Sequence, residues 1–444
     1  MIIKIGGQSP FTAARRSRAH PTNKPDSTRN REEQDRISWT LLFRLPIKLA
    51  KSNRSALRSR RPRPQLSSQP LIHNGRFLMS NSNYLILACD GGGIRGLIPS
   101  LLLQNLKENF PQLLTQHTYL FAGTSTGGII SLALACQIDP LELVGLYSTD
   151  GAAIFSPSAC LSSASPMAAA KAAAVAAGQS WWEFIAEHLM DLICPWYDNT
   201  GLRNMLMSKL GSNANATLNS LVSGGSPQYV LVNTMQLCDS NNAWVPLQLT
   251  NLPNLANNDS GQTVVIDAAL STSAAPMYFP PYNHPSYGYC ADGGVFANNP
   301  GTIALTTLIE SGINLDDIWM LSLSTGNTIN CYPSSIINTV GAGNFGPLFW
   351  VYPLQQPDPP SGQPYTPALP LMSTVFDGTS DVDAYQCAQL LSGRYMRANV
   401  PLSQPIALDD YSPAAITAME NSVNTYLGGS DWASIGTWIT NNFG

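Results

Sequence analysis

Two glycine-rich segments hold residues whose types and spacing are suited to chemistry. Residues 90–96 read Asp-Gly-Gly-Gly-Ile-Arg-Gly, and residues 123–127 read Gly-Thr-Ser-Thr-Gly. Consecutive glycines let the backbone approach a bound group closely, and their N–H groups can hold a phosphate or the oxyanion of an ester under attack. The second segment is a G-x-S-x-G motif, in which a sharp turn exposes the hydroxyl of Ser125.

The flanking sequence places both segments on strand-to-helix turns. An apolar run at residues 84–89 leads into the first segment, and a helical pattern at residues 97–110 follows it. The second segment lies between the apolar run 119–122 and the apolar helical stretch 129–136. In this context the motif indicates a nucleophilic serine, supported by small neighbours at Gly123 and Gly127.

The first segment also matches a dinucleotide-binding pattern at Gly91, Gly93 and Gly96. That pattern needs an acidic residue at the end of a second strand about 20 residues further on. Residues 108–112 instead read Glu-Asn-Phe-Pro-Gln, which is typical of a helix end. A nucleotide-binding protein remains an alternative, although it leaves Ser125 without a role.

A nucleophilic serine needs a general base. The chain has five histidines, which are His20, His73, His117, His188 and His284. Only His284 suits the chain order of a hydrolase triad, and its surroundings read as a turn without a strand–loop signal. Asp292 is the better candidate, because Gly293 and Gly294 after it allow close approach to another element.

Three motifs, DGGGIRG, GTSTGG and DGGVFANNP, occur here in the order found in patatin-like phospholipases, and the chain resembles that family. Residues 271–281, 197–211 and 395–410 also fit the family pattern. The resemblance covers most of residues 81–440 and none of residues 1–78.

The resemblance implies a three-layer α/β/α fold with a mostly parallel central sheet. It also implies a Ser–Asp dyad that needs no histidine, with Ser125 as the nucleophile and Asp292 as the base. The oxyanion hole would be formed by three glycines and the arginine beside them, Gly91, Gly92, Gly93 and Arg95. Without a histidine, we expect no essential ionisation near the ~6.5 of an unperturbed imidazole.

Family members of this kind are lipid acyl hydrolases of the phospholipase A, lysophospholipase or galactolipase type. The resemblance therefore implies cleavage of acyl esters through an acyl-enzyme. Acyl transfer to an acceptor other than water remains an alternative, because it uses the same intermediate. We expect lipid in a membrane or micelle as the partner, and no nucleic acid.

The charge divides the chain near residue 80. Residues 1–80 hold 17 Lys+Arg and 4 Asp+Glu, a net charge of +13, whereas residues 81–444 carry a net charge of −17. The first segment is predicted to be disordered apart from a short amphipathic patch at residues 39–51. Three interpretations of this segment are open. It is a basic arm that binds anionic lipid or nucleic acid, a transit peptide, or a stretch that does not belong to the working protein. We favour the last, with Met79 as the natural start.

Residues 81–444 are predicted to form one α/β domain, because continuous apolar runs are typical of a parallel sheet covered on both faces. The predicted strands are residues 84–89, 119–122, 229–234, 264–266 and 318–324. Residues 156–195 form an insertion with an apolar helical face at 181–192, interpreted as core packing or as a cap over an acyl pocket. Residues 353–370 hold seven prolines and are predicted to be an extended surface loop.

Cofactors and location are inferred from the remaining features. Residues 377–383 have three carboxylates without calcium-loop spacing and are predicted to cap a helix, and no metal or other cofactor is expected. The 8 cysteines include no C-x-x-C pair, and Cys89 and Cys136 lie in apolar runs. This pattern fits a reducing compartment better than a disulfide framework. We expect a cytoplasmic protein with peripheral contact to membranes.

Overall fold

The computed structural model describes residues 83–161, 194–222, 228–256, 259–327 and 369–444, with the single positions 331, 334, 337, 338, 342 and 350. The basic segment, Met79, the helical face at 181–192 and residues 353–368 of the proline-rich stretch lie outside the described residues. What the sequence predicts for them, and the boundary near residue 80, stay predictions.

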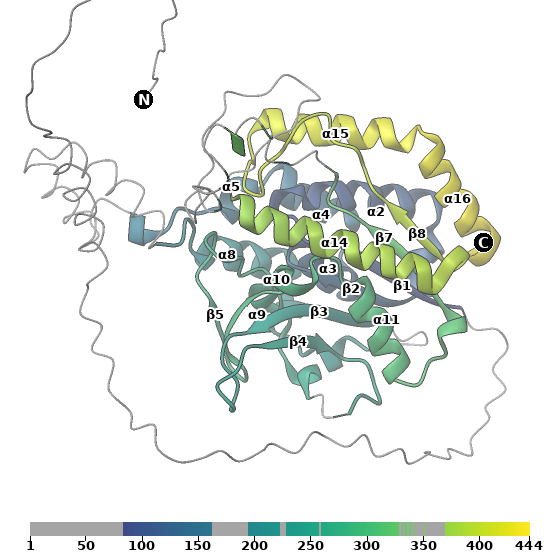
Figure 1. Cartoon of the computed structure of the whole chain (residues 1–444). Coiled ribbons are helices and arrows are strands. Elements are labelled where there is room, and N and C mark those ends of the chain that lie inside the picture. The colour runs from purple at the N-terminus through teal and green to yellow at the C-terminus, as the bar shows by residue number, and fades with distance from the viewer. Residues whose placement is uncertain are drawn as a thin grey trace, which may run out of the picture. The chain divides into compact units, whose positions relative to one another are not determined.

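A mixed sheet of eight strands lies at the centre of the described chain (Figure 1). The strand β1 (Tyr84–Cys89) pairs in parallel with β2 (Thr118–Thr124) on one side and with β7 (Ile318–Leu323) on the other. Further out, β3 (Tyr229–Gln236) pairs in parallel with β2, and β8 (Tyr395–Ala398) with β7. The mostly parallel sheet expected from the continuous apolar runs is confirmed.

Two strands run antiparallel to this set, β4 (Val245–Thr250) and β6 (Gly288–Asp292). The short strand β5 (Tyr282–His284) pairs antiparallel with β6 and therefore runs in the same direction as β3. β4 lies along one edge of β3. On the other edge, β2 pairs with residues 229–233, and β6 approaches from the opposite direction to pair with residues 234–236. The carboxyl ends of β2 and β6 therefore meet on the same edge of β3.

The two faces of the sheet carry separate cores. Along β1, the side chains of Leu85, Leu87 and Cys89 join one cluster, and those of Ile86 and Ala88 join the other. The helices that pack on the first face include α2 (Leu97–Asn109), α3 (Thr126–Ala135), α9 (Val265–Thr272) and α15 (Pro413–Leu427). On the second face lie α11 (Gly301–Glu310) and α14 (Pro370–Leu391).

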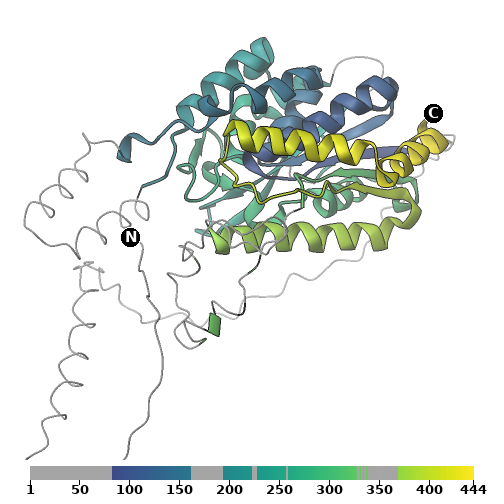
Figure 2. The same cartoon turned by 90° about the horizontal axis from the view of Figure 1, so that it is seen from above.

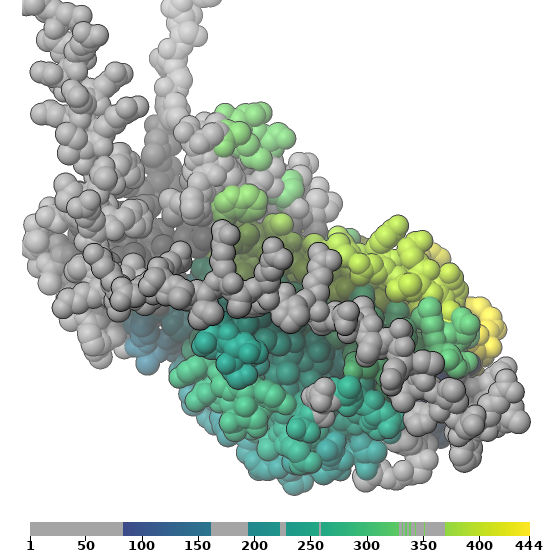
Figure 3. Space-filling model, turned by 60° about the horizontal axis from the view of Figure 1, so that its bottom comes forward, coloured from purple at the N-terminus to yellow at the C-terminus, as the bar shows by residue number. Residues whose placement is uncertain are grey.

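Figure 2 shows α14 and α2 on opposite sides of the strands, which confirms the three-layer arrangement. The teal and green surface in Figure 3 belongs to the part of the chain that carries β3, β4, α9 and α11. The remaining α-helices in the described ranges are α4 (Pro140–Ser148), α5 (Gly151–Ile154), α8 (Asn199–Leu210), α10 (Gly294–Ala297) and α16 (Ser430–Phe443). None of the helices among the described residues has the length and hydrophobicity needed to cross a bilayer.

Two local predictions are wrong. Residues 264–266 were expected to form a strand but lead into α9, where Val265, Ile266 and Leu270 are all buried. Three apolar residues are too few to distinguish a buried strand from a buried helix. Residues 377–383 were expected to cap a helix but lie inside α14, which begins at Pro370 because proline is well suited to a first helical position.

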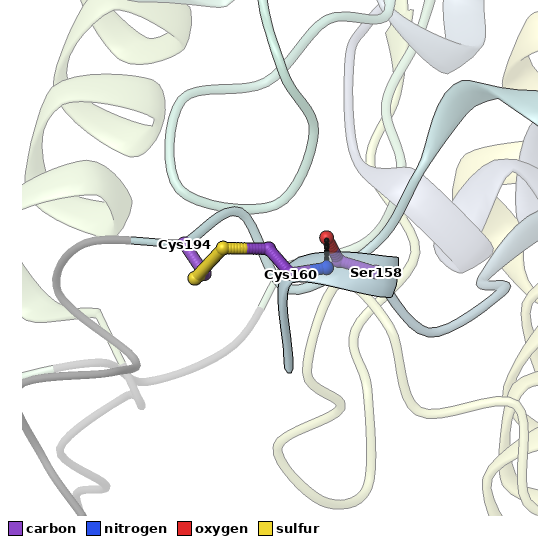
Figure 4. Close-up of a disulfide and its surroundings, with 3 residues drawn as sticks. All are labelled: Ser158, Cys160 and Cys194. Atoms are coloured by element: carbon purple, nitrogen blue, oxygen red, sulfur yellow. Dashed lines mark hydrogen bonds between the residues drawn. A yellow bond between two sulfur atoms is a disulfide. The ribbon is translucent and has the colours of Figure 1, made fainter. Parts of the chain in front are cut away.

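The cysteine prediction holds only in part. Cys89 and Cys136 are free and buried, as expected. Cys160 and Cys194, however, form a disulfide with a Cα–Cα distance of 5.8 Å across the base of the insertion (Figure 4). An antiparallel bridge between Pro157 and Tyr197 brings these cysteines together, and spacing alone did not reveal that contact. The cysteine pattern did not predict this bond, and the compartment stays a prediction.

Candidate active site

Ser125 follows β2 directly and has φ 56° and ψ −123°, a conformation that is strained for any residue other than glycine. Its N–H donates to Thr272 Oγ1 at 2.9 Å, and the Thr272 hydroxyl donates in turn to Asn233 O at 2.6 Å. Its carbonyl oxygen accepts from Ile129 N–H at 3.0 Å, which starts α3. Contacts to α9 and β3 thus hold the strained turn, as the G-x-S-x-G motif predicts.

The turn is packed too tightly for side chains at its glycines. A Cβ at Gly123 would lie 2.0 Å from Gly127 O, and a Cβ at Gly127 would lie 2.0 Å from Cys89 O. Both obstacles are backbone atoms of the turn or of β1, so they cannot rotate away. The supporting role predicted for these two glycines therefore has a steric basis.

We expect Gly127→Ala to destabilise the protein by about 3 kcal/mol or more, because β1 or α3 must shift to admit the methyl group. The control is Gly378→Ala, in the interior of α14, where an added Cβ meets nothing within 4 Å. That change should stabilise the helix by about 0.5–1 kcal/mol. Thermal unfolding of both variants checks this. Equal melting temperatures would contradict the packing described.

Asp292 is the last residue of β6 and is 0% exposed. Its Oδ1 accepts from Gly294 N–H at 2.7 Å. Burial raises the pKa of Asp292 to about 7, while hydrogen bonding from the Ser125 side chain and from Gly294 N–H acts in the opposite direction. Among the described residues, Oδ2 has no partner at ordinary hydrogen-bond geometry. The Ser125 contact is therefore longer or less well aligned than an ordinary hydrogen bond, as is common without substrate.

The meeting of β2 and β6 explains why these two residues are neighbours. Thr124 pairs with Asn233, and Asp292 pairs with Thr234, one residue further along the same edge of β3. A Cβ at Gly293 would lie 2.4 Å from Asn233 O, so glycine is required where the chain leaves β6. The structure thus brings Ser125 and Asp292 together across 167 residues of sequence.

The glycine loop after β1 offers fewer donors than the sequence suggested. Gly91 N–H donates to Asn298 O at 3.0 Å and is already used. Within the described chain, the N–H groups of Gly92 and Gly93 make no hydrogen bond, and both residues line the pocket that contains Ser125. Gly93 has φ 59°, and a Cβ there would lie 2.1 Å from Leu408 O. Two of the three glycine N–H groups therefore remain available as donors at the pocket.

Arg95 lies beside the loop and does not line the pocket that contains Ser125. Its Nε donates to Gly92 O at 3.4 Å, and it lines a separate polar cavity. Burial lowers the pKa of Arg95, while Asp377, Tyr278 and Asp90 act in the opposite direction. The guanidinium therefore supports the loop from behind and is not placed at the apolar pocket.

Asn298 was not predicted as a site residue, although it lies in the DGGVFANNP run. Its carbonyl accepts from Gly91 N–H, and its side-chain Nδ2 donates to Gly91 O at 3.2 Å and to Ser380 Oγ at 2.9 Å. A Cβ at Gly91 would lie 2.2 Å from Asn298 Oδ1 and 3.1 Å from Ser125 Cβ. Asn298 therefore ties the glycine loop to the segment that carries Asp292.

The pocket in front of Ser125 is almost entirely apolar. Side chains from α3, α4, α5 and the segment after α9 line it, including Ile129, Leu146, Ile154, Phe155 and Phe279. Phe155 stacks on Phe279, with ring centroids 6.0 Å apart. Such a lining accepts a hydrocarbon chain and leaves the hydroxyl and the two glycine N–H groups as the polar end.

The two histidines that the structure describes, His117 and His284, do not line the pocket that contains Ser125. His284 is buried at the end of β5, and its Nδ1 accepts from the N–H groups of Ser286 and Tyr287 at 3.0 and 3.3 Å. Burial lowers the pKa of His284. His117 ends the π-helical turn before β2, and His188 lies outside the described residues. In the described chain, no three His, Cys, Asp or Glu residues are grouped to hold a metal.

Comparison with known proteins agrees with the geometry. Residues 87–305 match the family model of Patatin-like phospholipase. A cGAMP-activated phospholipase from Pseudomonas aeruginosa (strain BWHPSA011 / Pa011) is 28% identical over 223 residues, which are 50% of this chain and 56% of that protein. Another from Escherichia coli (strain TW11681) is 27% identical over 267 residues, 56% of this chain and 64% of that protein.

A plant relative is matched over more of its length. Patatin-like protein 4 from Arabidopsis thaliana is 23% identical over 376 residues, 76% of this chain and 81% of that protein. By contrast, the chain spans less than two thirds of the length of the two bacterial relatives. The matched residues 87–305 include the Ser125 turn, the glycine loop and Asp292, and it is this part of the chain that is similar to the patatin-like phospholipase family.

Proposed function

We propose that this protein hydrolyses acyl esters of lipids through a Ser125–Asp292 dyad and an acyl-enzyme, without a metal. The observation that carries the proposal is the meeting of a strained, pocket-facing serine with a buried carboxyl group at the shared edge of β3. The apolar pocket and the phospholipase relatives support lipid as the substrate class.

The proposed reaction begins when ionised Asp292 takes the proton of the Ser125 hydroxyl as Oγ attacks the ester carbonyl. The new oxyanion accepts hydrogen bonds from the N–H groups of Gly92 and Gly93. As the intermediate collapses, the C–O bond breaks and Asp292 protonates the departing alcohol. A water molecule then loses a proton to Asp292 as it attacks the acyl-enzyme, and Asp292 returns that proton to Ser125 Oγ as the ester bond breaks and the fatty acid leaves.

The pH dependence follows from the pKa of the proposed base. Asp292 must be ionised to accept a proton, and burial raises its pKa to about 7. We therefore expect kcat/KM on a soluble ester to fall about tenfold per pH unit below pH 7 and to level off above it. A pH profile from 5 to 9 measures this. An acid limb with an apparent pKa near 4 would contradict the desolvated base.

This expectation corrects one inference from the sequence. A dyad without histidine was expected to show no ionisation near 6.5, but desolvation moves the Asp292 carboxyl into that range. An acid limb near pH 7 therefore cannot distinguish aspartate from histidine, and variants must do so.

Two alternatives are separated by one pair of assays. A nucleotide-binding glycine loop would need charge for phosphates, whereas the described lining of the pocket at Gly92 and Gly93 has no charged side chain. A fluorophosphonate should label wild type at Ser125 and leave a pure nucleotide binder unlabelled. Release of free fatty acid from phospholipid or galactolipid micelles, compared with transfer to an added alcohol, separates hydrolysis from acyl transfer. Absence of both labelling and release would overturn the proposal.

A further inference from the structure

The two proposed oxyanion donors belong to adjacent peptide units of the glycine loop. The N–H of Gly92 shares its peptide with the carbonyl of Gly91, and the N–H of Gly93 shares its peptide with the carbonyl of Gly92. A trans peptide is planar, and its C=O and N–H bonds point in opposite directions. Whatever holds the carbonyl of one of these peptides therefore also sets the direction of its N–H donor.

The carbonyl of Gly91 is held by two side chains that come from distant parts of the sequence. Thr325 Oγ1 donates to it at 2.8 Å, and Asn298 Nδ2 donates to it at 3.2 Å. Thr325 and Asn298 are 4% and 5% exposed, so water competes little for these bonds. Asn298 Nδ2 also donates to Ser380 Oγ at 2.9 Å, whereas a hydroxyl has a single proton to donate. Thr325 therefore makes the shorter bond and commits its only donor to Gly91 O.

The carbonyl of Gly92 is held at longer distances and from nearby in the chain. Arg95 N–H donates to it at 3.2 Å, and Arg95 Nε donates to it at 3.4 Å. Arg95 belongs to the turn Gly93–Gly96 that follows the loop, so these contacts do not tie the loop to another element. The peptide that carries the Gly92 N–H is thus the one that is fixed from outside the loop.

Strand pairing places Thr325 next to the glycine loop. β1 and β7 are parallel neighbours, and Asp90 N–H, just after β1, donates at 3.0 Å to Leu323 O at the end of β7. Gly91 and Thr325 follow where the chain leaves these two strands. The segment that carries Thr325 is itself fixed, because Ser324 N–H donates at 2.9 Å to the last carbonyl of β8.

The side chain of Thr325 lies directly against the backbone of the loop. A Cβ at Gly92 would lie 2.3 Å from Thr325 Oγ1 and 2.5 Å from Thr325 Cβ. Gly92 lines the apolar pocket that contains Ser125, whereas Thr325 lines the polar cavity that Arg95 also lines. Because Thr325 holds the carbonyl of the Gly91–Gly92 peptide, the N–H of that peptide points away from the Thr325 hydroxyl.

We propose that Thr325 is a positioning residue of the oxyanion hole. Its hydroxyl orients the Gly91–Gly92 peptide so that Gly92 N–H is directed at the carbonyl oxygen of an ester that Ser125 attacks. This inference rests on the proposed lipid hydrolase function. It adds to that function a residue that lies beyond residues 87–305, the part of the chain that matches the family model.

Thr325→Val tests the proposal, because it replaces the hydroxyl with a methyl group and keeps the branched shape. A misdirected donor weakens interactions with the developing oxyanion and leaves ground-state binding of the ester unchanged. Loss of a whole oxyanion-hole donor costs about 10²–10³ in kcat, and in this variant Asn298 still holds the Gly91 carbonyl. We therefore expect kcat on p-nitrophenyl butyrate to fall about tenfold, with KM within about twofold of wild type.

Thr118→Val is the matched control. Thr118 is 2% exposed, and its Oγ1 donates to Leu113 O at 2.8 Å. The same exchange thus removes the same kind of bond at the start of β2, whereas Ser125 follows the end of that strand. Thr118→Val should keep kcat within about twofold of wild type, and melting temperatures confirm that both variants are assayed as folded proteins.

Smaller substitutions at the same position isolate the hydroxyl without the bulk of valine. Thr325→Ser keeps the donor and should keep kcat within about threefold of wild type. Thr325→Ala differs from it only by the hydroxyl and should be about tenfold slower than Thr325→Ser. This pair tests the same bond even where valine prevents folding.

Inhibitor binding gives a second measurement of the oxyanion hole. Hexyl trifluoromethyl ketone forms a tetrahedral adduct with a nucleophilic serine, and the oxyanion of the adduct accepts from the same donors as the reaction intermediate. Hexyl methyl ketone has the same chain but binds as the unreacted ketone. In Thr325→Val, the inhibition constant of the trifluoromethyl ketone should rise about tenfold, and that of the methyl ketone should stay within about twofold. In Thr118→Val, both should stay within about twofold.

A Thr325→Val protein with kcat within twofold of Thr118→Val would overturn the proposal, as would a Thr325→Ser protein as slow as Thr325→Ala. A rise in KM with unchanged kcat would also contradict it, because that result shows a loss of ground-state binding. A wild-type protein that turns over no ester and is not labelled at Ser125 by a fluorophosphonate would instead contradict the proposed function, and these outcomes can be told apart.

Discussion

Replacement of Ser125 by alanine is expected to reduce ester hydrolysis by about 10⁴-fold or more, because no other group can form the acyl-enzyme. The fold should remain intact. Alanine keeps the Cβ, and the backbone bonds to Thr272 Oγ1 and Ile129 N–H do not involve the hydroxyl. The measurement is kcat/KM on p-nitrophenyl butyrate, with the melting temperature as the test of folding.

Ser131→Ala is the matched control, because Ser131 lies on the same helix, α3, and is fully buried. Its hydroxyl has no hydrogen-bond partner among the described residues, so its loss should cost neither activity nor stability. A Ser125→Ala protein with more than trace activity would show that another residue is the nucleophile.

The second large effect is expected at the proposed base. Asp292→Asn should lower kcat/KM by roughly 10²–10⁴-fold, because asparagine keeps the shape and the acceptor for Gly294 N–H but cannot take a proton. The histidine comparison is His284→Asn, whose Oδ1 can replace Nδ1 as acceptor for Ser286 N–H. We expect that variant to stay within several-fold of wild type. An inactive His284→Asn beside an active Asp292→Asn would refute the dyad.

Asp292→Asn should also change the pH dependence of stability. Folding raises the pKa of Asp292 from 3.8 to about 7, so the native state holds its proton more tightly than the unfolded state. The free energy of unfolding of wild type should therefore fall between about pH 4 and pH 7 and level off above. Relative to wild type, the variant should gain up to about 4 kcal/mol above pH 7. Thermal melts at pH 5 and pH 8 measure the difference.

Much of the fold could be read from the sequence because four of its strands contain continuous, mainly apolar runs. Residues 84–89 form β1 as predicted, the runs at 119–122 and 229–234 lie in β2 and β3, and the run at 318–324 contains β7. Continuous hydrophobicity marks strands that are buried on both faces, and this signal is local. A run of only three apolar residues does not distinguish a buried strand from a buried helix, which is why residues 264–266 were assigned wrongly.

The positions of Ser125 and of the two glycine turns could also be predicted from the local sequence. The turn that carries Ser125 is defined by a strand, a tight turn and a helix that follow one another in sequence. A side chain at Gly123 or Gly127 would clash with backbone atoms, so both positions require glycine. Asp292 could be chosen from its flanking glycines and the family resemblance. What the sequence could not contain was the reason for its proximity to Ser125.

Only the tertiary structure decided that proximity, because β2 and an antiparallel β6 must share one edge of β3 for their ends to meet. It likewise engaged the Gly91 N–H with Asn298 O, placed Arg95 in the lining of a separate polar cavity, and joined Cys160 to Cys194. It also raised the pKa of Asp292 to about 7, since desolvation depends on what surrounds a carboxyl group. Residue types and the local backbone conformation of the turns depend on residues that are neighbours in sequence. Strand pairing, the burial of Asp292 and the availability of the glycine N–H donors depend on residues that are neighbours only in the folded structure.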